Sequence, residues 1–319
     1  TEKISILNEV IERVKASDFC FVLNYGGLKV TQLTTLRQEL NKHNARAMVL
    51  RALFYPDPQA FNGVVLLAIA AAAWEWGRLS GWSQLLALAL GAACAALCVL
   101  AWGLLGAAGA PLWLWAFGAG AWVLGGGLLL RAGVAGWPRI PQALRLLGGL
   151  LALWLAWLAV AQARGQGVNF LLSILALVWV ADIGAYFAGR ALGLRFTRGK
   201  LAPTISPGKS WEGVWGGMLA TVVLAIVWVV LDAAQLTWSP SFYSHVQRSV
   251  GWPGLVVVVL CLAAMSVVGD LVESLIKRSV GVKDSSHLLP GHGGVLDRID
   301  ALLPTLPLAM MVFSWIHTP

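Results

Sequence analysis

Residues 256–269 read VVVVLCLAAMSVVG, and residues 270–279 continue as DLVESLIKRS. Together with the apolar residues from 252, this run is long enough to cross a bilayer, because a helical span needs about 20 residues. Backbone N–H and C=O groups in lipid must pair within their own segment, so we expect a helix over 252–275. Carboxylates at the end of such a helix are costly in lipid and indicate a functional site.

The composition extends this interpretation to the rest of the chain. Of its 319 residues 58% are hydrophobic and only 12% are charged, and the mean hydropathy is +0.75. Soluble domains are about 45–50% apolar and about 25% charged. We therefore expect an all-α fold, a polytopic membrane protein with about eight transmembrane helices. The expected spans lie at about 61–77, 82–107, 111–130, 145–163, 168–189, 212–232, 252–275 and 302–317.

Basic residues are distributed unevenly between the expected loops. The net charge of +8 would point to nucleic acid in a soluble protein, but a bias of Lys and Arg toward cytoplasmic loops explains it here. If the loop 131–145 is cytoplasmic, the alternation of successive spans leaves only Arg164 and Arg248, among the basic residues after residue 60, on the opposite side. We therefore predict a bacterial inner-membrane protein that does not bind nucleic acid. The basic residues on the cytoplasmic side are Arg78, Arg131, Arg139, Arg145, Arg190, Arg195, Arg198, Lys200, Lys209, Lys277, Arg278, Lys283 and Arg298.

Residues 1–51 differ in kind from the remainder. They combine helical periodicity over 1–19, a strand and turn at FCFVLNYGGLKV, and a second amphipathic helix in VTQLTTLRQELNKH, which is typical of a soluble α/β domain. Alternation would put this basic segment outside, so we expect that one span is missing before residue 61. Residues 1–48 resemble the N-terminal part of bacterial ribosomal protein uL10, and the stretches VLNYGGLKVTQLTTLRQEL and NARAMV carry this resemblance. A fusion, an artefact of sequence assembly and a cytosolic cap remain open.

One face of the 252–279 segment gathers polar groups. Asp270, Glu273, Ser274 and Lys277 recur at spacings of three and four, so they share one helix face. The simpler interpretation is a surface ladder of ion pairs. The apolar sequence that precedes these residues places the face at the membrane, where it needs a cation or a water-filled cavity.

Two further carboxylates lie in expected spans. Asp182, in VWVADIGAYFAGR, lies eight residues before Arg190, which is deep for an unpaired carboxylate, and we expect it to face a cavity. Glu75, in AAAWEWGRL, lies at the end of the first expected span. We interpret it as an interfacial anchor near Arg78.

Two polar loops contain groups suited to phosphate. In TISPGKSWEG, Ser206 and Lys209 precede a helix whose N-terminal N–H groups suit an anion, although a basic cytoplasmic flank would look the same. In KDSSHLLPGHGGVLDRID (283–300), glycines allow the backbone to approach a ligand, and Asp297 and Asp300 flank Arg298. Carboxylates bind Mg²⁺ together with substrate phosphates, and Arg and Lys hold the remaining oxygens. These residues favour metal-assisted phosphoryl or nucleotidyl transfer.

The segment SLIKRSVGVKDSSHLLPGHGGVLDRID (274–300) resembles the signature of the phosphatidate cytidylyltransferases, also called CDP-diacylglycerol synthases. AAAWEWGRL, VADIGAYFAGR, KLAPTISPGKSWEG and GDLVESLIKR are similar to that family as well, and the resemblance covers about 52–317. It implies the reaction of CTP with phosphatidate, with Mg²⁺, in an all-helical membrane domain over 52–319. It also implies a homodimer with a cytoplasmic active site.

The resemblance assigns roles to residues of this chain. Asp270 and Asp297 match the metal-binding aspartates, and with Lys277 and Lys283 they form the expected catalytic set. Whether a second, monovalent cation joins Mg²⁺ is left open. The expected substrate-binding residues are Ser206, Lys209, Ser274, Arg278, Asp284, His292 and Arg298.

Two other functions fit the residues alone. Asp182, Asp270 and Glu273 resemble the relay of an ion-coupled transporter. Another membrane transferase, acting on a phospholipid or a polyprenyl phosphate, would also use such loops.

Overall fold

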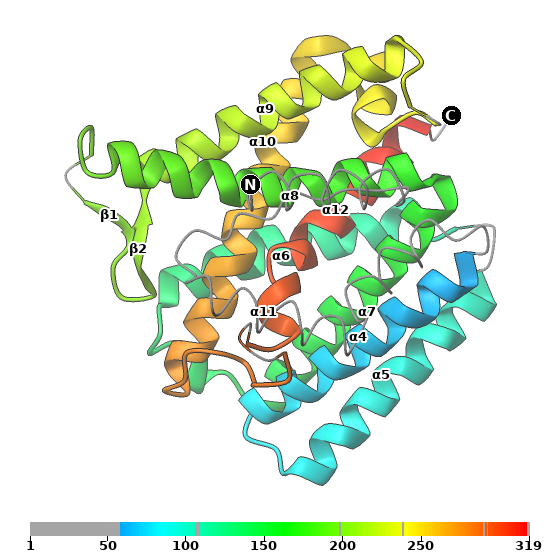
Figure 1. The fold of residues 1–319 in the computed structure, drawn as a ribbon. Coiled ribbons are helices and arrows are strands. Elements are labelled where there is room, and N and C mark those ends of the chain that lie inside the picture. The colour runs from blue at the N-terminus through cyan, green and yellow to red at the C-terminus, as the bar shows by residue number, and fades with distance from the viewer. Residues whose placement is uncertain are drawn as a thin grey trace, which may run out of the picture. The chain divides into compact units, whose positions relative to one another are not determined.

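The computed structural model describes residues 58–105, 109–197, 199–237, 239–289, 291 and 293–317. Figure 1 shows that this part of the chain is built of helices, with one two-stranded hairpin at its edge. The expected α/β-like segment over 1–51 lies outside the described residues. The helices are α4 (Pro58–Leu79), α5 (Gln84–Leu105), α6 (Leu112–Ala132), the 3-10 helix η2 (Trp137–Arg139), α7 (Gln142–Gln166), α8 (Val168–Leu192), α9 (Trp211–Ala233), α10 (Phe242–Ser279), α11 (Leu296–Ile299) and α12 (Leu302–His317).

Each expected apolar run corresponds to one of the helices α4–α10 or α12, although α5 is shorter than the run expected over 82–107 and α6 begins one residue after the start of the run at 111. Seven helical segments of the described residues are long and apolar enough to cross a membrane. They include α5 to α10 and the segment Leu296–His317, whereas α4, which covers the expected span at 61–77, is not among them. The chain is thus a nearly all-α, multi-pass membrane protein.

Alternate loops meet at one end of the helices, as the charge pattern predicts. The Trp76 Nε1 of α4 donates to the Arg145 carbonyl of α7 at 3.1 Å, and Gln142 Nε2 donates to the Ser80 carbonyl at 2.9 Å. We call the end formed by the loops 80–83, 133–141, 193–197, 199–210, 280–289 and 293–295 the site end. The described loop residues 109–111, 167, 234–237 and 239–241 belong to the opposite end.

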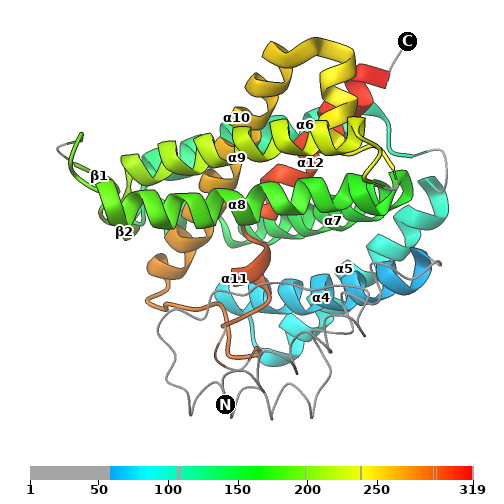
Figure 2. The same cartoon turned by 45° about the horizontal axis from the view of Figure 1, so that its top comes forward.

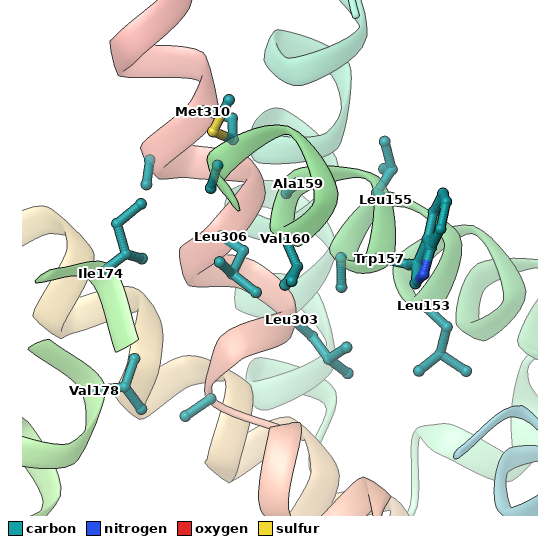
Figure 3. Close-up of a cluster of buried hydrophobic side chains, with 14 of the residues drawn as sticks. Leu153, Leu155, Trp157, Ala159, Val160, Ile174, Val178, Leu303, Leu306 and Met310 are labelled. Carbon is teal, nitrogen blue, oxygen red and sulfur yellow. The ribbon is translucent and has the colours of Figure 1, made fainter. Parts of the chain in front are cut away.

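The core forms where α7, α8 and α12 meet. Figure 3 shows Val160 of α7 beside Leu306 of α12, with Ile174 of α8 to the left of them. These residues are buried, and Ile174 is completely so. In a bilayer such contacts between helices come from close packing rather than from exclusion of water.

Helices α8 and α9 run side by side in both views (Figures 1 and 2). Small residues permit this approach, since a Cβ on Gly217 would lie 2.6 Å from the Ala181 carbonyl oxygen, and one on Gly184 would lie 2.8 Å from Ala220 Cβ. Small residues at helix contacts let backbones pack closely in membranes. The connection between these two helices is the hairpin of β1 (Lys200–Ala202) and β2 (Ser206–Ser210), which pairs antiparallel.

Helix α10 begins and bends for identifiable reasons. The Ser241 side chain caps it by accepting the Ser244 N–H at 3.2 Å. Gly251, at φ 72°, interrupts the helical backbone two residues before Pro253, so the expected span from 252 follows a kink. A positive φ costs glycine little, and proline cannot donate into the preceding turn.

Asp232, at the C-terminal end of α9, organises the opposite end. Its Oδ2 accepts the Ser241 N–H at 2.8 Å and the hydroxyls of Ser241 and Ser244, both at 2.5 Å. Its Oδ1 accepts from Asn169 at 3.0 Å and from Thr237 at 2.7 Å. This buried carboxylate therefore connects α8, α9 and the start of α10.

We expect Asp232→Asn to destabilise the fold by about 1–3 kcal/mol, because an amide nitrogen would face donors and leave buried N–H or O–H groups without an acceptor. Thermal unfolding in detergent measures the effect. Unfolding at the wild-type temperature would contradict the role given to Asp232.

Candidate active site

A cavity of about 420 Å³ opens at the site end between α8, β2, α9 and α10. Asp182, Lys209 and Asp270 line it, and Lys209 forms an ion pair with Asp270. The Ser274 hydroxyl lies 3.3 Å from Asp270 Oδ1, so it donates to the same carboxylate. Residues 61 positions apart in the sequence therefore meet because the hairpin returns Lys209 to the end of α10.

The α8 wall of this cavity carries polar groups among apolar ones. Asp182 faces the cavity, as its depth in the sequence predicts, and Tyr186 and Arg190 line the same wall. The Arg190 Nη1 donates to the Tyr186 hydroxyl at 3.0 Å. Ala185, Val214, Met218, Ala263 and Val267 are among the apolar residues that complete the lining.

About two helical turns beyond Asp270, Lys277 holds two carboxylates. Its Nζ lies 2.5 Å from Glu273 Oε2 and 2.5 Å from Asp297 Oδ1. All three side chains are almost buried, with exposed fractions of 12%, 5% and 6% for Lys277, Glu273 and Asp297. The shared face predicted for α10 is confirmed, and it is an enclosed network rather than a surface ladder.

The second oxygen of Asp297 is fixed by the preceding loop. It accepts the Ser285 N–H at 2.9 Å, the Ser285 hydroxyl at 2.8 Å and the Gly294 N–H at 2.7 Å. Gly293 has φ +80°, and a Cβ there would lie 2.8 Å from Asp297 Oδ2. The sequence predicted that the glycines of this loop admit a ligand; in the structure Gly293 makes room for the Asp297 carboxylate.

The same loop encloses a second cavity of about 380 Å³. Gly293, which contacts Asp297, is part of the lining of this cavity. The cavity brings three of the predicted site residues together. Its lining comprises Lys283, Asp284, His287, Leu289, Gly291, Gly293 and Arg298.

The remaining predicted residues do not join these groups. Ser206 begins β2 and does not line either cavity. Arg278 is exposed, and its Nη1 lies 3.5 Å from the Val282 carbonyl. His292 lies outside the described residues.

Sequence reasoning missed two buried carboxylates that hold the loops. Glu75 does not contact Arg78, which donates to the Trp82 carbonyl, so its interpretation as an interfacial anchor is wrong. Glu75 is completely buried and bonded to the loop after α10. Glu212, buried in the first turn of α9, accepts both N–H and hydroxyl of Thr197 at 2.8 Å. In both cases the available signal was a lone acid beside apolar residues. The partners of Glu75 lie more than 200 positions away, too distant in the sequence to be inferred.

The charges at the site end suit a divalent cation. Asp182, Asp270 and Asp300 lie close enough for their charges to interact, and Glu273 adjoins Asp297. Lys209 and Lys277 form ion pairs with three of these five carboxylates. Among the described residues no three His, Cys, Asp or Glu side chains form a closed metal cage. Mg²⁺ needs only one or two carboxylates beside water and substrate phosphates, so the donor set fits it.

Comparison with known proteins separates the chain into two parts. Residues 1–53 match the ribosomal protein L10 family, in agreement with the predicted resemblance. The phosphatidate cytidylyltransferase of Haemophilus influenzae is 48% identical over 142 residues, which are 44% of each chain. That of Brucella suis is 40% identical over 171 residues, 53% of each chain.

The most extensive of these alignments is with the phosphatidate cytidylyltransferase of Pseudomonas aeruginosa, 40% identical over 272 residues, covering 82% of this chain and 90% of that protein. Residues 44–316 match the family described as the cytidylyltransferase family, and they include both cavities and the carboxylate network between them. The chain belongs to the cytidylyltransferase family.

Proposed function

We propose that this chain transfers a cytidylyl group from CTP to phosphatidate, giving CDP-diacylglycerol and pyrophosphate for phospholipid biosynthesis. The family and the names of its relatives support this reaction over an ion-coupled transporter. The observation that carries it is the Lys277–Glu273–Asp297 network, which lies between an apolar-walled cavity and a loop cavity lined by basic groups.

The two cavities differ in a way that supports separate substrates. The walls of the first come from three membrane helices, with Lys209 at its polar end, so it suits a lipid whose phosphate meets an ammonium. The second is formed by a loop and offers Lys283 and Arg298, which suit the oxygens of a triphosphate. We assign phosphatidate to the first cavity and the CTP phosphates to the second.

The reaction needs positioning more than proton transfer. A phosphate monoester has its second pKa near 6, so the attacking oxygen of phosphatidate is largely ionised at neutral pH. That oxygen attacks the α-phosphorus of CTP, and the bond to pyrophosphate breaks. Lys209 orients the attacking phosphate, while Lys283 and Arg298 offset the charge that develops on the leaving pyrophosphate. Lys277 keeps Asp297 in place.

Nucleotidyl transfer commonly uses a divalent metal, and we propose Mg²⁺ held by Asp270 and Asp297. When bound, it would neutralise phosphate charge and align the two substrates. Ser274 and Lys209 orient Asp270, and Ser285 and Gly294 orient Asp297, so both carboxylates are fixed before substrates arrive.

We propose that the site end faces the cytoplasm of a bacterium and that the chain spans its inner membrane as a homodimer. The positive residues gathered in the loops of the site end support this orientation. The boundary between a soluble segment at 1–51 and the membrane domain from 52 is part of the proposal.

Membranes containing the chain, incubated with labelled CTP and phosphatidate, should form a lipid-soluble cytidine product, because the cytidylyl group moves to the lipid. Polyprenyl phosphate should not replace phosphatidate. Product formation from polyprenyl phosphate alone would identify a different transferase, and no product from either lipid would contradict the proposed function.

Asp270→Asn and Asp297→Asn should each lower kcat by at least about 100-fold, since loss of a preorganised charge at a reacting phosphate has that magnitude. Both variants should still insert and be purified. Near-normal turnover of either purified variant would remove that aspartate from the metal site.

Lysine substitutions should separate the two cavities. Lys283→Ala should raise the KM for CTP about tenfold, and Lys209→Ala should raise the KM for phosphatidate by a similar factor, since charge-assisted bonds are lost. Arg248→Ala, an exposed cation at the opposite end, is the matched control and should change neither KM. A reversed pattern would exchange the two substrate assignments.

A further inference from the structure

Both carboxylate oxygens of Glu75 are hydrogen-bonded to the loop after α10. Its Oε1 accepts the Val295 N–H at 2.9 Å and the Ser286 hydroxyl at 2.6 Å. Its Oε2 accepts the Leu296 N–H at 2.7 Å and lies 3.1 Å from the Ser285 hydroxyl, whose single proton it shares with Asp297 Oδ2. Each oxygen thus accepts one backbone amide and contacts one serine hydroxyl.

The donors belong to two short segments on either side of the loop cavity. Ser285 and Ser286 follow the exposed residues Lys283 and Asp284, and Val295 and Leu296 follow the glycines that reach Asp297. Between them, His287 and Leu288 are exposed, and one bridge joins Leu289 to Gly293. Glu75, which belongs to α4, therefore draws the two ends of this loop together.

Glu75 is linked to Asp297 through one side chain, that of Ser285. The Ser285 hydroxyl lies 3.1 Å from Glu75 Oε2 and 2.8 Å from Asp297 Oδ2, so one side chain links both carboxylates. A Cβ on Gly294 would lie 2.5 Å from Glu75 Oε1 and would overlap the Ser285 hydroxyl, so a side chain at position 294 would displace this contact. A shift of Glu75 would consequently move the groups that orient Asp297.

We propose that Glu75 is a positioning residue for the cytidylyl transfer: it fixes the loop 285–296 and, through Ser285 and Gly294, the Asp297 carboxylate that binds Mg²⁺. This inference rests on the proposed function for its link to the metal. The anchoring itself rests on the hydrogen bonds alone.

The amide of glutamine cannot replace this carboxylate. Both oxygens of Glu75 accept a backbone N–H, and these amides cannot reverse their polarity as a serine hydroxyl can. Glu75→Gln therefore leaves either Val295 or Leu296 without an acceptor, whichever way the amide turns. Glu75→Asp keeps both acceptor oxygens and loses only reach, so it should retain part of the anchoring.

The first measurement is hydrogen exchange of the full-length protein in detergent, without metal or substrate, followed by mass spectrometry. Glu75→Gln should increase exchange in peptides covering 285–296 and leave those covering 200–210 unchanged, and Glu75→Asp should give an intermediate increase. The control is Asp232→Asn, a buried carboxylate with similar partners at the opposite end, which should not alter the 285–296 peptides. Wild-type exchange in Glu75→Gln would overturn the anchoring.

The second measurement is the Mg²⁺ dependence of cytidylyl transfer. Glu75→Gln should raise the half-saturating Mg²⁺ concentration by about tenfold, the usual size of an effect on the groups that orient a metal ligand. Its KM for phosphatidate should stay near the wild-type value, and Asp232→Asn should keep the wild-type Mg²⁺ response. Faster loop exchange with an unchanged Mg²⁺ response would overturn the link to Asp297. A wild-type chain without transferase activity would contradict the proposed function, while the exchange data would still decide the anchoring.

Discussion

Three parts of the chain hold the Asp297 carboxylate: α10 and the following loop contact it, and α4 holds that loop. Lys277 of α10 pairs with one oxygen, Ser285 and Gly294 of the loop bind the other, and Glu75 of α4 holds that loop from behind. A charge at the end of an apolar bundle is costly unless it is paired and hydrogen-bonded. The need to compensate buried carboxylates therefore shapes the loop as much as any ligand does.

The same constraint acts at both ends, with different results. At the opposite end Asp232 is surrounded by hydroxyls, an amide and a backbone N–H, and its bonds join helices. At the site end lysines pair with only part of the acidic groups. A carboxylate satisfied by neutral donors stabilises a fold, whereas a group of carboxylates with too few lysines favours a further cation.

Helix packing then decides which groups share a cavity. The small residues between α8 and α9 bring these helices together, and the hairpin that connects them carries Lys209 to Asp270. Glu212 holds the start of that connection through Thr197, much as Glu75 holds the other loop. The lipid-facing and nucleotide-facing parts of the proposed site are thus each fixed by a carboxylate outside the reacting groups.

The sequence by itself determined the class of the protein, because an apolar run of sufficient length has no alternative in lipid to a helix. It also determined that Asp270, Glu273, Ser274 and Lys277 share a face, since helical spacing alone dictates this. The signature of residues 274–300 identified the family, which the comparisons confirmed.

Only the tertiary structure decided what those residues contact. The partners of Glu75 lie more than 200 positions away, and no local pattern encodes such a pairing. The sequence did not predict the hairpin at 200–210, which lies in a loop of basic residues. Lys209 and Lys283 line different cavities because this hairpin and the loop after α10 fold back separately. Local periodicity fixes which residues share a helix face, but packing between distant helices determines which carboxylates are satisfied by the chain and which are left for a ligand.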